Sequence, residues 1–402
     1  MNAIGSAATV RSGPGTGPGL RRDPLAALAA TLAPAVIFAL VRGLGVIVLA
    51  ALAAANDTRL GTALRAWDGE WFLGLAQGGY DGVPPGLADA NGMRTAETPL
   101  AFFPGYPATT AALRFLTGLP SEAAGVAAAT LAGIAAAYGV CRLGRLVPGG
   151  SRRVGLIMVA LFAGTPMGVV LTMAYSEALF CALAAWSLVG VLSRRWVLAG
   201  AMCGLAGLVR PTAAALVLAV GMAALVAVVQ RHDGLRPWAG AALAPLGLLG
   251  YLGWVAARTG SATGWFDLQN RGWGSRFDGG AATAQFAASV LVSVPSAFEV
   301  LTVAVLAGGL VLLAVGVVRA VRGGLPWPLL VYGAGVLIMD VGSNGLMNSK
   351  ARLLLPAFTL LLPVALGLAR RRPATTVATL VAVALGSAWF GAYALTAWQY
   401  AI

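Results

Sequence analysis

Two carboxylates lie between two tryptophans in the stretch RAWDGEWFLGLAQGGY, residues 65–80. Asp68 and Glu70 are two positions apart, so on a helix their side chains point in widely different directions. They therefore cannot cooperate as a pair of catalytic carboxylates. The chemistry available is that of one carboxylate acting alone, such as a general base. A solvated helix whose acidic side chains only face water fits the same spacing.

The large apolar side chains of this stretch share one face of the expected helix. Trp67, Trp71, Phe72 and Leu75 recur at spacings of four, five and eight residues, which is typical of an amphipathic helix. Helices with tryptophan on the apolar face lie along membrane interfaces. We expect this helix at the outer membrane boundary, with its apolar face down.

Charged residues interrupt several apolar runs of the chain. A charge near the bilayer centre costs about 2.5–3.5 kcal/mol on insertion scales, so it normally faces protein or a water-filled cavity. One interpretation is a set of structural Arg–carboxylate pairs between helices. The other is a cationic pocket of Arg42, Arg210 and Arg352 that holds an anionic lipid headgroup, since arginine's planar fork suits phosphate. The charges within the expected spans are Arg42, Glu177, Glu299 and Asp340.

A second polar stretch, WFDLQNRGWGSRFDGG at 265–280, mixes aromatic rings, amides, arginines and glycines. Such a mixture is able to stack on a sugar and to hydrogen-bond its hydroxyl groups. Trp273 and Arg276 are therefore candidate substrate-binding residues. An ordinary glycine-rich interfacial loop has the same composition.

The residues available exclude several kinds of active site. The only histidine, His232, lies in an expected cytoplasmic loop, so Ser-His-Asp and Cys-His catalysis are unavailable on the outer side. The three cysteines are far apart in apolar segments, which favours packed helix residues over a metal or disulfide cluster. The chain has no Walker loop and no dinucleotide fingerprint. We expect no metal and no cofactor, and a donor substrate that arrives already in the membrane.

The composition indicates a multi-pass membrane protein. Of 402 residues, 59% are hydrophobic and 10% are charged, far below the roughly 25% charge of soluble domains. The net charge of +13 comes largely from arginines in short loops, where they set topology, so it does not indicate a nucleic-acid partner. We expect a disordered cytoplasmic tail at 1–24 and one transmembrane domain at 25–402, placed in the cell membrane.

Arginine positions predict the orientation, because cytoplasmic loops of membrane proteins are rich in arginine. Loops 56–100 and 258–284, with a short one near 343–352, are expected outside, and they carry eight of the ten acids that lie outside the expected spans. The result is about eleven crossings, with the N-terminus inside and the C-terminus outside. The expected spans are 30–54, 122–141, 154–173, 176–193, 197–209, 212–229, 237–257, 297–318, 326–344, 353–369 and 374–397.

Two regions fit this scheme poorly. If the apolar stretch 101–119 crossed the membrane, it would place the next arginine cluster outside, so we interpret it as a re-entrant or interfacial helix. The segments 197–209 and 212–229 are short and broken at Arg210–Pro211. This break indicates half-helices that meet near the outer boundary, where non-helical backbone is tolerated only if it lines a cavity.

Five blocks in series resemble the PIG-V-type mannosyltransferases and cover roughly residues 65–358. WDGEWFLGLAQGGY resembles that family's W-D-x-E-x-F…A-x-x-G-Y motif, AFFPGYP (101–107) resembles F-F-P-G-[FY]-P, and AYSEALF (174–180) resembles Y-S-E-[AS]-L-F. SKARLLLPAF (349–358) resembles the late R-x-x-x-P-x-[FL] segment. GLVRPT (207–212) matches only the arginine of the family's R-S-N-G stretch, which puts acceptor recognition in doubt but not the chemistry.

The resemblance implies a GT-C fold, an all-α polytopic enzyme whose first large outer loop carries the catalytic aspartate. It implies inverting transfer of mannose from a polyprenyl-phosphate donor to a hydroxyl of a lipid-linked or cell-envelope acceptor, facing the extracytoplasmic side. The eukaryotic family acts on a glycosylphosphatidylinositol precursor that a bacterium lacks, so the acceptor does not carry over. Asp68 matches the catalytic position, and the other matched positions are Glu70, Tyr175, Glu177, Arg210 and Arg352.

The residues agree with such a transfer. An inverting reaction needs one base on the face opposite the leaving group, and no protein acid when the leaving group departs as a stable phosphate, so one carboxylate with arginines is sufficient. A glycosidase would need two facing carboxylates. Two alternatives stay open. One is a transporter or scramblase of lipid-linked sugars, which buried charges and broken helices suit equally well; the other is a catalytically inactive subunit that scaffolds a partner enzyme.

Overall fold

The computed structural model describes residues 24–402, so the expected tail at 1–24 lies, except for Pro24, outside the described residues. Within that part every named element is an α-helix or a short 3-10 helix, and the strand-like pairing is one isolated bridge between Phe277 and Ser343. The expected all-α class is confirmed. Contacts divide the chain into the compact units Met1–Ala33 and Pro34–Ile402. The larger unit carries all the candidate site residues and is described below.

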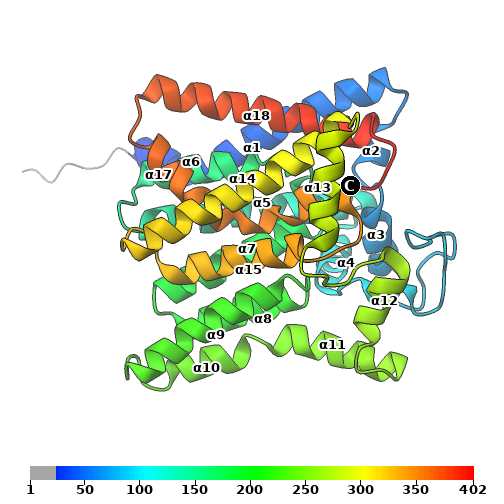
Figure 1. Ribbon diagram of the computed structural model, residues 1–402, viewed down its shortest axis with the longest axis horizontal. Helices are drawn as coiled ribbons and strands as arrows, with labels where there is room; N and C mark the ends of the chain where they lie inside the picture. Colours follow the sequence, from blue (N-terminus) through cyan, green and yellow to red (C-terminus); the bar gives the residue numbers. More distant parts are fainter. Residues whose placement is uncertain (1–23) are drawn as a thin grey trace, which may run out of the picture. The chain divides into compact units, whose positions relative to one another are not determined.

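Most helices follow one another with short connections, and the loop 79–97 between α3 and η1 is a long one (Figure 1). Their bounds are α1 (Pro24–Ala55), α2 (Leu60–Ala63), α3 (Asp68–Gly78), η1 (Thr98–Ala101), α4 (Gly105–Thr117), α5 (Ser121–Leu146), α6 (Arg152–Ala163), η2 (Gly168–Leu171), α7 (Glu177–Leu192), α8 (Trp196–Gly207), α9 (Ala213–Val229), α10 (Arg236–Leu243), α11 (Leu246–Thr259), α12 (Gly264–Trp273), α13 (Ala281–Val292), α14 (Ala297–Val321), α15 (Trp327–Val341), η3 (Met347–Ser349), α16 (Lys350–Leu353), η4 (Leu355–Leu361), α17 (Leu362–Leu368) and α18 (Pro373–Thr396).

Within residues 24–402, five helical segments are long and apolar enough to cross a membrane, and a sixth is added if the bent pair Met347–Leu353 and Leu355–Leu368 counts as one span. The expected multi-pass membrane protein is thereby supported. The expected figure of about eleven crossings requires that the shorter apolar helices cross as well. The long segments are Ala27–Ala55, Ser121–Leu146, Arg236–Thr259, Ala297–Val321 and Pro373–Thr396, and the shorter ones are Glu177–Leu192, Trp196–Gly207, Ala213–Val229, Ala281–Val292 and Trp327–Val341.

The continuous span expected over 154–173 is wrong. Helix α6 ends at Ala163, Gly164 follows as its C-cap, and the short 3-10 helix η2 begins only at Gly168. Proline explains the interruption, since Pro166 disfavours helical backbone at the residue before it. The break expected at Arg210–Pro211 is confirmed, because α8 ends at Gly207 and α9 begins at Ala213.

Glycines allow the helices of this unit to approach closely. A Cβ atom built on Gly144 of α5 would lie 2.8 Å from the Cα of Gly155 in α6, and one built on Gly200 of α8 would lie 2.4 Å from the carbonyl oxygen of Gly240 in α10. Real Cβ atoms do not come this close, so any larger residue would force the helices apart. Small residues at helix crossings are the usual basis of packing in membranes.

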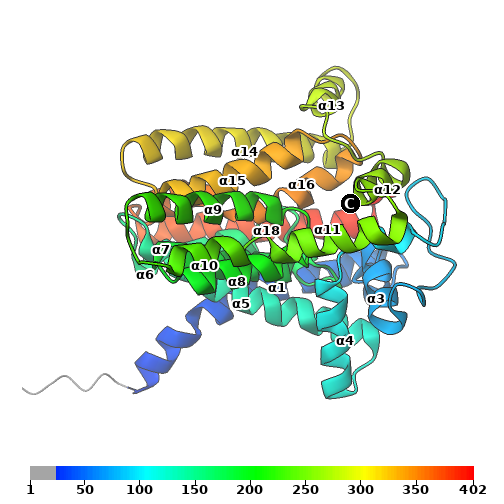
Figure 2. The same cartoon turned by 90° about the horizontal axis from the view of Figure 1, so that it is seen from below.

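The stretch expected to be re-entrant or interfacial, 101–119, contains α4 (Gly105–Thr117). This helix packs on α3 and α5, and in Figure 2 it runs across the direction of the neighbouring long helices. Its end carries the exposed apolar side chains Phe115 and Leu116. Because α4 is too short to count among the candidate spans, the expectation that it does not cross alone is consistent with the structure.

Candidate active site

Asp68 is the first residue of α3, and the backbone immediately before it is strained. Trp67, the N-cap, has φ 60° and ψ −120°, a left-handed conformation that residues with a side chain rarely adopt. Such a residue costs about 1–3 kcal/mol and persists only where its surroundings fix it. The Tyr175 hydroxyl donates to the carbonyl oxygen of Ala66 at 3.1 Å, next to this turn. The strained turn therefore sets Asp68 as the first residue of α3.

The apolar face of α3 packs on the protein instead of lying against lipid. Trp71, Phe72 and Leu75 are buried, whereas Trp67 is 42% exposed because it precedes the first turn of the helix. Trp67 therefore does not share the apolar helix face on which it was expected. Trp71, Phe72 and Leu75 share that face, but they are buried in the protein and do not lie at the membrane interface as expected. Aromatic contacts, not the bilayer surface, fix the orientation of α3.

Phe72 joins the three sequence blocks that resemble family motifs. Its ring meets Phe102 with centroids 5.5 Å apart, Tyr106 at 5.3 Å and Tyr175 at 6.2 Å, each edge-on. Tyr106 is fully buried and donates its hydroxyl to the Gly125 carbonyl at 2.8 Å. Pairs of this kind contribute about 0.5–1.5 kcal/mol beyond burial. The cluster holds α3, the segment 102–106 and the start of α7 together.

Asp68 makes an ion pair with Arg352, which lies 284 residues later in the chain. Arg352 Nη1 donates to Asp68 Oδ2 at 2.6 Å, a short charge-assisted hydrogen bond. The guanidinium side chain is 8% exposed and the carboxylate 29%. Asp68 is thus the one member of the pair that faces outward, where a substrate hydroxyl could reach it.

Glu177 and Arg210 extend the ion pair into a cluster of four charges. Glu177 Oε1 lies 2.6 Å from Arg210 Nη1 and 3.7 Å from Arg352 Nε, and the carboxylate is fully buried. Arg210 also donates to the Ser176 hydroxyl at 2.9 Å. Two carboxylates and two guanidinium groups cancel in charge. This balance is what allows four ionised groups to be buried together, since an unpaired charge would be far more costly.

Tyr175 is the buried support beneath this cluster. The guanidinium carbon of Arg352 lies over its ring at 5.2 Å from the centroid, a cation–π distance. Next to it the Ala174 amide donates to the Leu64 carbonyl at 2.8 Å, which ties the start of α7 to the segment before Asp68. Tyr175 is therefore fully buried behind Arg352 and is not exposed at the site.

Glu70 is directed away from the cluster, as its spacing from Asp68 predicts. Its carboxylate lies 3.8 Å from Arg65 Nε, and Arg65 also donates to Glu122 at 2.9 Å. Both Glu70 and Arg65 are well exposed, at 46% and 38% of their side chains. The structure thus does not bring Glu70 to the other candidate residues.

Arg42 does not contact Arg210 or Arg352, so the expected three-arginine pocket is wrong. It is buried and donates from Nη1 to the Ala163 carbonyl at 2.8 Å, the last residue of α6. A cation at a helix C-terminus offsets the partial negative charge of the unpaired carbonyls. A Cβ on Gly168 would lie 2.2 Å from Arg42 Nη1, so that glycine makes room for the guanidinium. Arg42 therefore compensates for the early end of α6.

Trp273 is the last residue of α12 and Arg276 lies in the segment that follows, and each contacts another part of the site. The Trp273 ring meets Phe102 edge-on at 5.5 Å. The Arg276 amide donates to the Asn344 side chain at 2.7 Å, and the Asn344 amide donates back to the Arg276 carbonyl at 2.9 Å. No side-chain ion pair of Arg276 occurs within residues 24–402. This loop thus anchors the segment that leads into Arg352.

The two remaining acids of the expected spans have different surroundings. Glu299 closes a capping box with Ser296 at the start of α14, which is a structural role. Asp340 is buried in α15, and neither carboxylate oxygen has a hydrogen-bond partner. Sequence reasoning missed Lys350, which is buried and donates to the Asp340 and Ser343 carbonyls at 2.5 and 2.6 Å. Its signal was available, because Lys350 is the only lysine of the chain.

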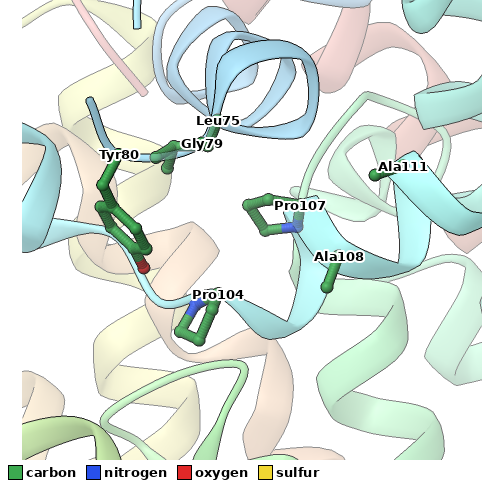
Figure 3. A pocket seen from close by; sticks show the side chains of 7 residues that line it. All are labelled: Leu75, Gly79, Tyr80, Pro104, Pro107, Ala108 and Ala111. Atoms are coloured by element: carbon green, nitrogen blue, oxygen red, sulfur yellow. The ribbon is translucent and has the colours of Figure 1, made fainter. Parts of the chain in front are cut away.

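A small apolar hollow lies between α3 and α4, at the end of α3 remote from Asp68 (Figure 3). Its volume is about 150 Å³, and Leu75, Tyr80, Pro107 and Ala111 are among its lining residues. The Tyr80 hydroxyl donates to the Phe102 carbonyl at 2.8 Å, and burial raises the pKa of this phenol well above its usual value. A neutral apolar hollow of this kind offers no catalytic group. Among the described residues, no three histidine, cysteine or acidic side chains are grouped so as to hold a metal ion.

A scan against models of known protein families and a search of curated proteins both return no match. Among solved structures, the chain is similar to ArnT from Cupriavidus metallidurans bound to undecaprenyl phosphate, with a TM-score of 0.53, 14% identity, and coverage of 86% of this chain and 62% of that one. The same enzyme without ligand gives a TM-score of 0.51 and 16% identity, over 78% of this chain and 57% of that one.

The oligosaccharyltransferase of Archaeoglobus fulgidus, in its apo form, gives a TM-score of 0.48 and 14% identity, over 90% of this chain and 56% of that one. This chain thus spans about three fifths of the length of the ArnT chain it resembles. The likeness to ArnT concerns the fold alone: this chain shares the helical architecture of that structure.

Proposed function

We propose that this protein is an inverting membrane glycosyltransferase that moves mannose from a polyprenyl-phosphate donor to a hydroxyl of a lipid-linked or cell-envelope acceptor, outside the cytoplasm. The observation that carries the proposal is the pairing of one outward-facing carboxylate, Asp68, with a buried arginine, Arg352, at 2.6 Å. This is the minimal set that an inverting transfer from a phosphate leaving group needs: one base and one group that stabilises the departing anion.

Asp68 takes the role of general base in this proposal. The acceptor oxygen attacks the anomeric carbon of the sugar on the face opposite the phosphate, and its proton passes to the Asp68 carboxylate. A new bond from the acceptor oxygen to the anomeric carbon forms as the bond from that carbon to the phosphate oxygen breaks. The bonding electrons leave with the lipid phosphate, which needs no proton from a protein acid.

Arg352 and Arg210 stabilise the charge that grows on the leaving phosphate. Both guanidinium groups approach Glu177, at 3.7 and 2.6 Å, so their positions are fixed before the donor arrives. Preorganised charges in a partly desolvated site contribute more than they would in water. Because the four charges of the cluster cancel, the empty site carries no net negative charge that would repel the donor.

The identity of the donor is supported by two independent lines. The sequence lacks the loops that hold nucleotide phosphates, which favours a donor delivered by the membrane. The ArnT structure of similar fold is bound to undecaprenyl phosphate. Mannose and membership of the PIG-V-type mannosyltransferases rest on the resemblance of the sequence blocks alone. Trp273 and Arg276 are the proposed contacts to the sugar or acceptor.

The test is a transfer assay with purified protein and synthetic polyprenyl-phosphate sugars, each with a radiolabelled mannose, glucose or arabinose. Membranes from cells with and without the gene supply the acceptor, and the labelled product is then isolated and identified. We expect label from the mannose donor in a product that forms only with the protein. Transbilayer movement of intact donor with no transfer of label would instead identify a transporter of lipid-linked sugars.

A further inference from the structure

In the proposed reaction, the single guanidinium group of Arg352 interacts with two anions, the Asp68 carboxylate and the donor phosphate. In the present structure its Nη1 contacts Asp68 Oδ2 at 2.6 Å. A carboxylate that accepts a short charge-assisted bond shares part of its negative charge with the guanidinium group, so it is a weaker acceptor for the proton of a hydroxyl group than an unpaired carboxylate. The same guanidinium must stabilise the leaving phosphate during transfer. These two tasks cannot be done in full at the same time.

Release of Asp68 would not leave Arg352 uncompensated. Its Nε stays 3.7 Å from Glu177, which is fully buried, and its guanidinium lies over the Tyr175 ring. A donor phosphate would supply a second negative charge in place of Asp68. The exchange of one anion for another keeps the buried cation paired, which is the condition under which such a rearrangement has a low cost.

We propose that Asp68 and the donor phosphate compete for Arg352, so that Arg352 determines specificity for donors that carry a phosphate. Only such a donor takes over the guanidinium and frees Asp68 to act as the base. The inference rests on the proposed function and goes beyond it, because it predicts an order of events: the phosphate binds first and the base becomes available second.

Competition between Asp68 and the donor phosphate predicts an effect on phosphate binding that a role for Asp68 in catalysis alone does not predict. Asp68→Asn removes the charged competitor, so the variant should bind a lipid phosphate more tightly than the wild type, by roughly tenfold for one charge-assisted bond. Simple repulsion between a carboxylate and a phosphate would also be relieved by this change. The two explanations differ in whether the tightening depends on Arg352.

The experiment measures binding of farnesyl phosphate and of farnesol to purified protein in nanodiscs, for wild type, Asp68→Asn, Arg352→Gln and the double variant. We expect tighter farnesyl phosphate binding in Asp68→Asn and unchanged farnesol binding. We expect no tightening when Asp68→Asn is added to Arg352→Gln, which a double-mutant cycle shows directly. Glu70→Gln is the matched control, since Glu70 lies on the same helix but contacts Arg65, and its effect should be small.

The outcomes separate this inference from the proposed function. If the wild type binds farnesyl phosphate no better than farnesol, the proposed phosphate site itself fails. The wild type could instead prefer farnesyl phosphate while Asp68→Asn leaves its binding unchanged, or while Asp68→Asn tightens binding to the same extent in the Arg352→Gln background. Either result contradicts the competition but leaves the proposed function standing. Should Arg352→Gln not fold, Arg352→Lys replaces it; that variant keeps the charge without the planar fork, and we expect a reduced tightening.

Discussion

Replacement of Glu177 by glutamine is expected to destabilise the protein strongly, because it removes the charge that two buried guanidinium groups share. Glu177 is fully buried, and the side chains of Arg210 and Arg352 are 12% and 8% exposed. Arg352 keeps Asp68 as a partner at 2.6 Å. Once the Glu177 charge is removed, the hydrogen-bond acceptor that Arg210 keeps among residues 24–402 is the neutral Ser176 hydroxyl. Most of the loss of stability therefore comes from Arg210.

The loss of one partner of a buried ion pair costs about 3–5 kcal/mol. Because glutamine keeps a carbonyl oxygen that can accept from Arg210, we place Glu177→Gln near the lower figure, about 3 kcal/mol. That corresponds to a change of roughly a hundredfold in the folding equilibrium constant. Membrane proteins often unfold irreversibly, so the half-life of folded protein at constant temperature, followed by size-exclusion chromatography, is the practical measurement.

Glu70→Gln supplies the comparison for this change. Glu70 and Arg65 are exposed and 3.8 Å apart, and an exposed pair contributes about 0–1 kcal/mol. The double variant Glu177→Gln with Arg210→Met removes both charges and should recover much of the stability. Equal effects of Glu177→Gln and Glu70→Gln, or a double variant less stable than Glu177→Gln alone, would refute the idea that the cluster is a balanced set of buried charges.

Three further predictions follow from other contacts of the site. Lys350→Met should weaken farnesyl phosphate binding severalfold, because Lys350 ties the segment before Arg352 to the Asp340 and Ser343 carbonyls. Lys350→Arg should retain part of the affinity that Lys350→Met loses, and Arg352→Ala should reduce the affinity more than Lys350→Met does. Sugar transfer should persist in excess EDTA, since in the proposed chemistry arginines stabilise the leaving phosphate; complete loss that Mg²⁺ or Mn²⁺ restores would contradict this. The Ala282 and Gly280 amides hold the pKa of Asp278 below its usual value, so these hydrogen bonds are fully present above about pH 4 and are lost as the pH falls through the lower folded pKa. Protection from hydrogen exchange at the start of α13, relative to the intrinsic rate at each pH, should fall in that range. Unchanged protection would count against this prediction.

Local spacing predicted those features of the site that depend on neighbouring residues. The two-residue separation of Asp68 and Glu70 implied divergent directions, and the structure places one on Arg352 and the other on Arg65. The proline at 211 implied a break between two short helices, and α8 and α9 are separated there. Both results follow from backbone geometry over a few residues.

Spacing could not predict partners that the fold brings from far along the chain. Arg42 and Ala163 are 121 residues apart, and nothing near Arg42 in the sequence indicates that α6 ends beside it. The pairing of Asp68 with Arg352 spans 284 residues. The resemblance to family motifs named both residues but gave no geometry, which only the three-dimensional fold supplies.

Trp67 shows a different limit of sequence reasoning. Its place in the apolar pattern fits a helix that begins before it, whereas the left-handed backbone at Trp67 delays the helix to Asp68. A strained residue of this kind has no signature in composition or periodicity, because its cost is met by tertiary contacts.

The central claim is that Asp68 alone is the base of a transfer from a lipid phosphate. The most direct test is the single-turnover rate of sugar transfer from polyprenyl-phosphate mannose by Asp68→Asn, with enzyme in excess and folding checked by size-exclusion chromatography. Loss of a general base lowers the rate by about 100- to 10,000-fold, and we expect that loss together with undiminished binding of farnesyl phosphate. A near-normal rate in a well-folded Asp68→Asn protein would contradict the claim.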